Sequence, residues 1–230
     1  MPSIKKILHF MSSAWVTAIS VGILGYGMST DWSKTTMECA RRGSDFFNGT
    51  AELTLELFSG NLERTFCPSF GGSVVFPVIP KLVETGVTPV VLHALALCLL
   101  VLCLVFSAAS ILISLYNSVS NPYETYMGPV GIYACSSLCA CLSVVVLILF
   151  VVNVNVTNLA EELVNEFATT EVDLKNKSSE MQLGYYLVIP YTVLSLVAIV
   201  LIYMYDHAAY TQRREQQRPT EDAPKEIMMY

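Results

Sequence analysis

Charged residues are scarce in this sequence. Only 14% of its 230 residues are Asp, Glu, Lys or Arg, whereas 53% are hydrophobic; a soluble domain usually carries about 25% charged residues. The net charge of −6 leaves no basic surface of the kind that binds nucleic acid. The P-loop, H-E-x-x-H and dinucleotide-binding G-x-G-x-x-G motifs are also missing. We therefore expect an integral membrane protein with no catalytic residues, no metal site and no cofactor.

Long apolar runs are what the sequence has instead. A helix needs roughly 20 apolar residues to cross the bilayer core, and four stretches reach that length: residues 7–28, 89–116, 127–152 and 183–205. A backbone in lipid must satisfy its own hydrogen bonds, so each is predicted to be a helix. None contains Asp, Glu, Lys or Arg, which argues against an ion or proton pathway.

The first stretch has an alternative interpretation. Lys5 and Lys6 precede its apolar run, as the basic residues of a signal peptide would. The run is longer than the usual 7–15 residues of such a peptide, which favours a retained helix.

Four crossings place both chain ends on one side of the membrane. Lys5, Lys6, Arg213 and Arg214 flank the first and last spans, and basic residues favour the cytosolic side. We expect a multi-pass plasma-membrane protein. Its predicted cytosolic parts are residues 1–6, 117–126 and 206–230, and its extracellular loops are residues 29–88 and 153–182.

Three N-x-[ST] sequons lie in the two predicted extracellular loops, which supports this orientation. They begin at Asn48, Asn155 and Asn176. Asn48 is the farthest from a membrane surface and is the best acceptor, whereas Asn155 lies next to the end of the third span.

Two of the seven cysteines, Cys39 and Cys67, lie in the first extracellular loop. An oxidising compartment favours a disulfide between them. This loop is too small for a core of its own, and its turns separate short apolar segments at residues 53–58 and 74–79. We therefore predict a small antiparallel sheet that lies over the helix ends. The other five cysteines lie inside predicted spans, where they act as small apolar residues.

The second extracellular loop is predicted to be partly helical. Apolar residues recur at helical spacing over residues 152–167, so the third span is expected to continue as an amphipathic helix. Its apolar side would cover part of the first loop; the alternative is an isolated surface helix.

Two further features suggest partners. Small residues such as Gly22, Gly25 and Gly27 let helices approach closely, either within the bundle or with another membrane protein. The chain ends in Met228, Met229 and Tyr230, an apolar ending that fits a PDZ-binding strand. The alternative is a tail without this role.

The short loop and the third span carry a family resemblance. Asn121-Pro122, followed by Gly128-Pro129-Val130-Gly131-Ile132-Tyr133, resembles the signature of the clarin family. The first loop departs from that pattern, since the family motif Tyr-Gly-Leu-Phe-x-Gly appears only as Leu57-Phe58-Ser59-Gly60, after Leu55-Glu56. The resemblance implies a claudin-like fold: an all-α membrane four-helix bundle with a small extracellular antiparallel β-sheet.

The same resemblance implies a non-enzymatic role, linked in this family to membrane and actin organisation in sensory cells. We expect an organiser or adaptor of membrane-protein assemblies. Its expected partners are the lipid bilayer, other membrane proteins, a PDZ scaffold and a second copy of the chain. The alternative is an auxiliary regulatory subunit of an ion channel.

Overall fold

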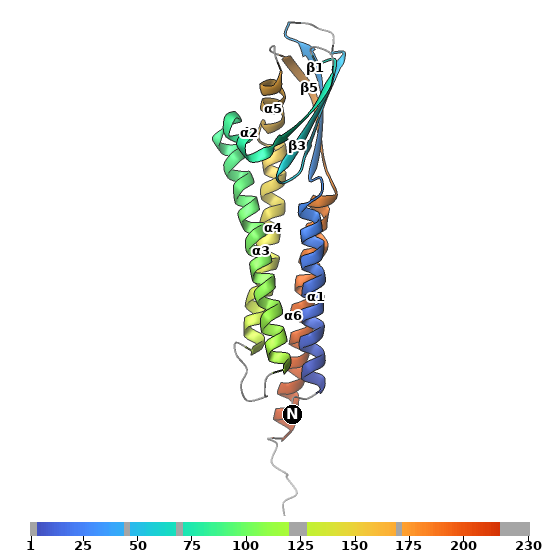
Figure 1. The fold of residues 1–230 in the computed structure, drawn as a ribbon. Helices are drawn as coiled ribbons and strands as arrows, with labels where there is room; N and C mark the ends of the chain where they lie inside the picture. The colour runs from blue at the N-terminus through green and yellow to red at the C-terminus, as the bar shows by residue number, and fades with distance from the viewer. Residues whose placement is uncertain (1–3, 44–46, 68–70, 120–127, 169–171, 217–230) are drawn as a thin grey trace, which may run out of the picture.

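Four long helices form a bundle that carries a β-sheet at one end (Figure 1). The computed structural model describes residues 4–43, 47–67, 71–119, 128–168 and 172–216. The long helices are α1 (Ile4–Met28), α3 (Val87–Val119), α4 (Gly128–Asn155) and α6 (Leu183–Gln216). All four contain a stretch long and apolar enough to cross a membrane. The predicted fold class, a membrane four-helix bundle with a small antiparallel sheet, is confirmed.

The four helices are arranged as a ring. α1 packs against α3 and α6, and α4 packs against the same two helices. Side chains of large volume fill the interior, among them Leu24 of α1, Leu100 of α3, Phe150 of α4 and Tyr191 of α6. α1 supplies buried core residues to the bundle.

The sheet has five antiparallel strands in the order β4-β3-β2-β1-β5. The strands are β1 (Ser33–Arg41), β2 (Gly49–Leu55), β3 (Ser59–Thr65), β4 (Gly72–Pro77) and β5 (Val172–Met181). Side chains alternate between a buried and an exposed face, as the pleat of a strand dictates. The sheet therefore has one apolar face to cover and one polar face.

Two short helices cover the apolar face. They are α2 (Val78–Thr85) and α5 (Leu159–Phe167), and with the five strands they form the unit that we call the cap. Leu53 and Leu62 of the sheet share one buried cluster with Leu82 of α2 and with Leu159 and Leu163 of α5. The amphipathic helix thus covers the first loop, as predicted.

The sequence-based prediction of the cap was wrong in two details. α5 does not continue α4: α4 ends at Asn155, and Thr157 donates its hydroxyl to the Asn153 carbonyl, the kind of local bond that competes with the helix ladder. The apolar segment 74–79 is not one strand, because Val78 already begins α2. Pro77 ends β4 at this point, since proline has no backbone N–H for a ladder bond.

Candidate functional site

A disulfide joins β1 to the segment that follows β3, across the intervening strand β2. Cys39 of β1 and Cys67, which follows β3, are bonded, with their Cα atoms 5.7 Å apart. Gly49 pairs with Cys39 across the sheet. A Cβ atom at Gly49 would lie 2.4 Å from the Phe66 carbonyl oxygen and 2.7 Å from the Cys39 sulfur. Only glycine leaves room for the bridge, which explains the middle residue of the Asn48 sequon.

The three sequon asparagines are all exposed, but their surroundings differ. Asn48 precedes β2, and Asn155 is the last residue of α4. Asn176 lies in an irregularity of the β1–β5 pairing and has φ +53°, a conformation that asparagine tolerates better than most residues. Its Nδ2 donates to Glu38 Oε2 at 2.7 Å. A glycan on Asn176 would have to displace this bond, so Asn48 remains the best predicted acceptor.

The exposed face of the sheet has an excess of acidic groups. Lys34 of β1 binds Glu52 of β2 at 2.8 Å. That hydrogen bond, supported by the charges of Glu52, Glu63 and Glu180, raises the pKa of the Lys34 ammonium. A hollow of about 350 Å³ nearby is lined by polar groups that include Asp31 and Glu56.

Trp32 connects the cap to the bundle. Its side chain is fully buried, and its Nε1–H donates to the Gly27 carbonyl at the end of α1 at 2.8 Å. Its ring meets Phe150 of α4 edge-on, with 4.9 Å between the centroids. A Cβ atom at Gly184 would lie 2.5 Å from the Trp32 ring and 2.7 Å from the Gly27 carbonyl oxygen. α1, α6 and the first strand therefore meet at a contact with no spare room.

Sequence reasoning missed Trp32. A tryptophan just beyond a predicted span usually indicates a side chain at the membrane–water interface, so its position alone gives no sign of burial. Two glycines were the available signal: Gly27 near the end of the first predicted span and Gly184 near the start of the fourth, where both spans approach the cap.

His93 of α3 is a second contact between the bundle and the cap. It is buried, and its Nε2 lies 2.8 Å from the carbonyl oxygen of Leu57, to which it donates. The residue therefore holds the β2–β3 connection over the bundle.

Hydroxyl groups and thiols form a polar layer inside the bundle. Ser107 of α3 and Tyr191 of α6 lie 2.9 Å apart, and Tyr191 also donates to the Cys103 carbonyl at 3.2 Å. Cys103 and Cys139 are buried where α3 meets α4. These partners satisfy buried polar atoms, which would be costly if left unpaired. Among the described residues, no group of three or more His, Cys, Asp or Glu side chains is placed to hold a metal ion.

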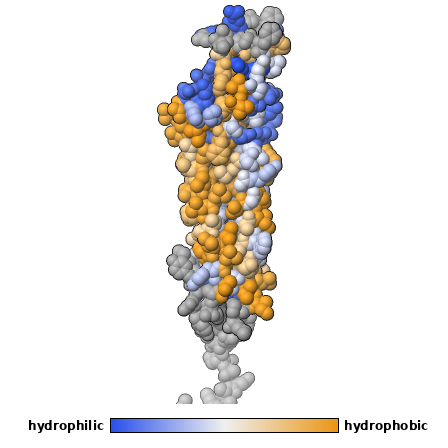
Figure 2. All heavy atoms as spheres, viewed as in Figure 1, coloured by the Kyte–Doolittle hydropathy of each residue, from blue (hydrophilic) through white to orange (hydrophobic). Residues whose placement is uncertain are grey.

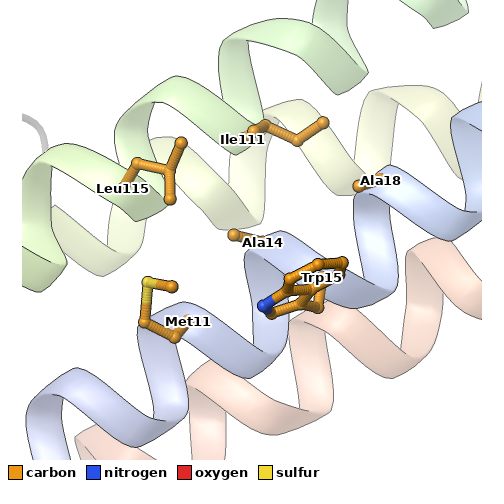
Figure 3. Close-up of a pocket in the computed structure, with 6 residues that line it drawn as sticks. All are labelled: Met11, Ala14, Trp15, Ala18, Ile111 and Leu115. Carbon is orange, nitrogen blue, oxygen red and sulfur yellow. The ribbon is translucent and has the colours of Figure 1, made fainter.

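A groove of about 200 Å³ opens on the side of the bundle between α1 and α3 (Figure 3). Ala14 and Ala18 form its floor, Trp15 and Met11 stand beside them on α1, and α3 contributes Ile111 and Leu115. The lining is almost entirely apolar.

The glycines of α1 divide into two sets. Gly27 is packed within the chain, where a Cβ atom would lie 3.2 Å from the Leu187 side chain. Nothing lies within 4 Å of the positions that a Cβ atom would take on Gly22 or Gly25. At helical spacing, Gly22 and Gly25 lie on the same side of α1 as Ala18. They extend the groove towards the cap as a surface of small residues, which we call the α1 stripe (Ala18, Gly22 and Gly25).

The residues of the family signature begin α4. Gly128 is its first residue, with φ +43°, a value that favours glycine. Pro129 follows in the first turn, where its missing N–H costs nothing. Gly131 is buried, and Tyr133 packs against a small cluster around Ile132. Four other predicted residues lie outside the described residues: Asn121, Pro122, Met228 and Tyr230.

Comparisons with known proteins agree on one family. The model of the Clarin-2-like family matches residues 5–202. Clarin-3 of Homo sapiens is 29% identical and clarin-3 of Mus musculus is 30% identical, each with the whole of both chains aligned. Clarin-1 of Homo sapiens is 25% identical over 70% of this chain and 71% of its own length.

Proposed function

Because this chain belongs to the clarin family, we propose that it is a non-enzymatic organiser of membrane-protein assemblies. In this proposal it lies in the plasma membrane with both termini in the cytosol and the cap outside. The family resemblance makes sensory-cell membranes, with their cortical actin, the setting in which to look for partners.

The α1 stripe is the observation that carries this proposal. Small residues on a lipid-facing helix let a second helix approach closely, and such contacts drive association in a bilayer, where no hydrophobic effect operates between helices. The stripe is open, and it continues into the groove beside Trp15 and Ile111. A helix that packed against Gly22 and Gly25 would place a larger side chain in this groove. The proposed partner surface is therefore the α1 side of the bundle.

A substitution that fills the stripe tests the proposal. Gly22→Leu adds a large side chain where a partner helix would lie, and glycine is about 1 kcal/mol less favourable than alanine in a helix, so the fold itself should not be weakened. Proteins cross-linked in native membranes would be captured with the full-length chain and quantified. We expect several-fold lower recovery of specific partners with Gly22→Leu.

Val200→Leu is the matched control, because Val200 is exposed on α6. It enlarges a lipid-facing side chain on another side of the bundle and should leave partner recovery unchanged. Equal recovery from Gly22→Leu, Val200→Leu and the unsubstituted chain would contradict the proposal.

An auxiliary subunit of an ion channel is the second candidate, favoured by the acidic face of the cap. The carboxylates of Asp31 and Glu56 line a hollow on that face, and such groups raise the local concentration of cations near a neighbouring pore. Co-expression separates the two functions. A current that changes only when a pore subunit is present, and that loses its change with Asp31→Asn and Glu56→Gln, would favour this candidate.

A further inference from the structure

We infer that the exposed side of α2 is a lipid-binding surface that rests the cap on the membrane. The surface consists of Ile79 and Val83 of α2 together with Val87, the first residue of α3; we call it the α2 stripe. Its ligand is the leaflet on the cap side, at the boundary between the headgroups and the acyl chains.

The rotation of α2 about its axis is fixed by contacts on its other side. Val78 and Leu82 are buried in the cluster beneath the sheet. Lys81 binds Glu166 of α5 at 3.3 Å, and its ammonium lies 4.8 Å from the centre of the Phe167 ring. With these contacts in place, the opposite side of α2 must face outwards. Ile79 and Val83 on that side are accordingly 41% and 65% exposed, and Val87 at the start of α3 is 80% exposed.

The α2 stripe continues the lipid-facing side of α3. Gly86 has an extended backbone and separates α2 from α3. On the α3 side of this break, Val87, Val91 and Leu95 are four positions apart in one helix, and all three are exposed. Figure 2 shows the same continuity, since the apolar colour on the side of the bundle extends up to the region of α2. A surface that already faces lipid along α3 therefore extends towards the cap through Val87, Val83 and Ile79.

The length of α3 allows α2 to lie at the membrane surface. Its 33 residues span about 50 Å at 1.5 Å per residue, whereas the hydrocarbon core is about 30 Å thick and the bilayer with its headgroups about 40–45 Å. α3 is therefore about 20 Å longer than the hydrocarbon core, which is enough to place its first turns and the adjoining α2 at headgroup level. Amphipathic helices at that level bury their apolar side by roughly 5–10 Å.

The chemistry of the stripe fits lipid better than a protein. Its side chains are aliphatic, whereas the residues that dominate protein interfaces are Trp, Tyr and Arg. Three small side chains also fall well short of the roughly 800 Å² that each partner contributes to a stable complex. The one acidic residue of α2, Glu84, is held by Lys81, which reduces the cost of placing it near the lipid.

Depth-resolved quenching tests the inference with the full-length chain. Val83→Trp would be reconstituted into phosphatidylcholine vesicles whose acyl chains carry bromine near the headgroup. The emission of the unsubstituted chain, which contains Trp15 and Trp32, is subtracted. We expect brominated lipid to quench the added emission more than twofold and aqueous acrylamide to quench it little.

Ser73→Trp is the matched control, because Ser73 is an exposed residue of β4 on the polar face of the same cap. It should show the reverse pattern. Two results would overturn the inference: acrylamide quenching of Val83→Trp equal to that of Ser73→Trp, or protection of Val83→Trp from both quenchers, which would mean that protein covers the stripe. Val87→Trp carries the same expectation should Val83→Trp fail to fold.

Discussion

Gly184→Ala is expected to loosen the junction between the cap and the bundle. The new methyl carbon would lie 2.5 Å from Trp32 Cδ1, 2.6 Å from Trp32 Nε1 and 2.7 Å from the Gly27 carbonyl oxygen. Each distance is far below van der Waals contact. The ring cannot retreat freely, since Phe150 packs against it and its Nε1–H is bonded to Gly27.

Two effects set the size of the change. Overpacking a tight core costs about 1–3 kcal/mol, and the loss of a buried hydrogen bond costs about 1–3 kcal/mol. Gly184→Ala should therefore lower the free energy of unfolding by about 2–6 kcal/mol. Unfolding in mixed micelles, followed through the combined fluorescence of the exposed Trp15 and the buried Trp32, measures this difference.

Gly22→Ala is the matched control. The same substitution is made in a helix of the same bundle, but nothing lies within 4 Å of the new carbon. It should be neutral or slightly stabilising, by up to about 1 kcal/mol, because alanine favours helix over glycine. Equal stability of Gly184→Ala and Gly22→Ala would refute the close contact at Trp32.

Two further predictions concern the cap. Gly49→Ala should prevent the Cys39–Cys67 bridge or strain the sheet around it, although the sequon is retained; thiol alkylation followed by mass spectrometry would detect free cysteines, and a fully formed bridge would contradict the reasoning. Asn176→Gly should keep the left-handed backbone, whereas Asn176→Val should cost about 1–2 kcal/mol at that φ; faster amide hydrogen exchange along β5 in Asn176→Val alone is the expected result, and identical exchange in both variants would count against it.

The bundle could be predicted from the sequence because its signal is local. Runs of apolar residues without charge identify lipid-facing helices wherever they occur, and two cysteines in one loop suggest a bridge. The sequence of β5, by contrast, is mostly polar over Val172–Met181 and has no strand signal of its own. It is a strand because it pairs with β1, more than 130 positions away. The pattern of residues within a segment does not predict contacts over such a distance in the sequence.

The candidate surfaces were only partly predictable for the same reason. Gly22, Gly25 and Gly27 are equivalent in the sequence, and only the position of α6 makes Gly27 an internal contact and leaves the other two open. Val78 and Ile79 continue an apolar run that is typical of a strand. They nevertheless begin α2, because Pro77 ends β4 and Val78 is buried in the cluster beneath the sheet. Burial of Trp32 likewise depends on three elements that meet only in the fold.

Photo-cross-linking from α1 in native membranes tests the central claim most directly. Benzoylphenylalanine would replace Trp15, which borders the groove and is 65% exposed, and in a parallel sample Tyr203 of α6, which is 59% exposed. The organiser function through the α1 side predicts discrete protein adducts from position 15 that Gly22→Leu removes, and mainly lipid adducts from position 203. Lipid adducts alone from both positions would contradict it.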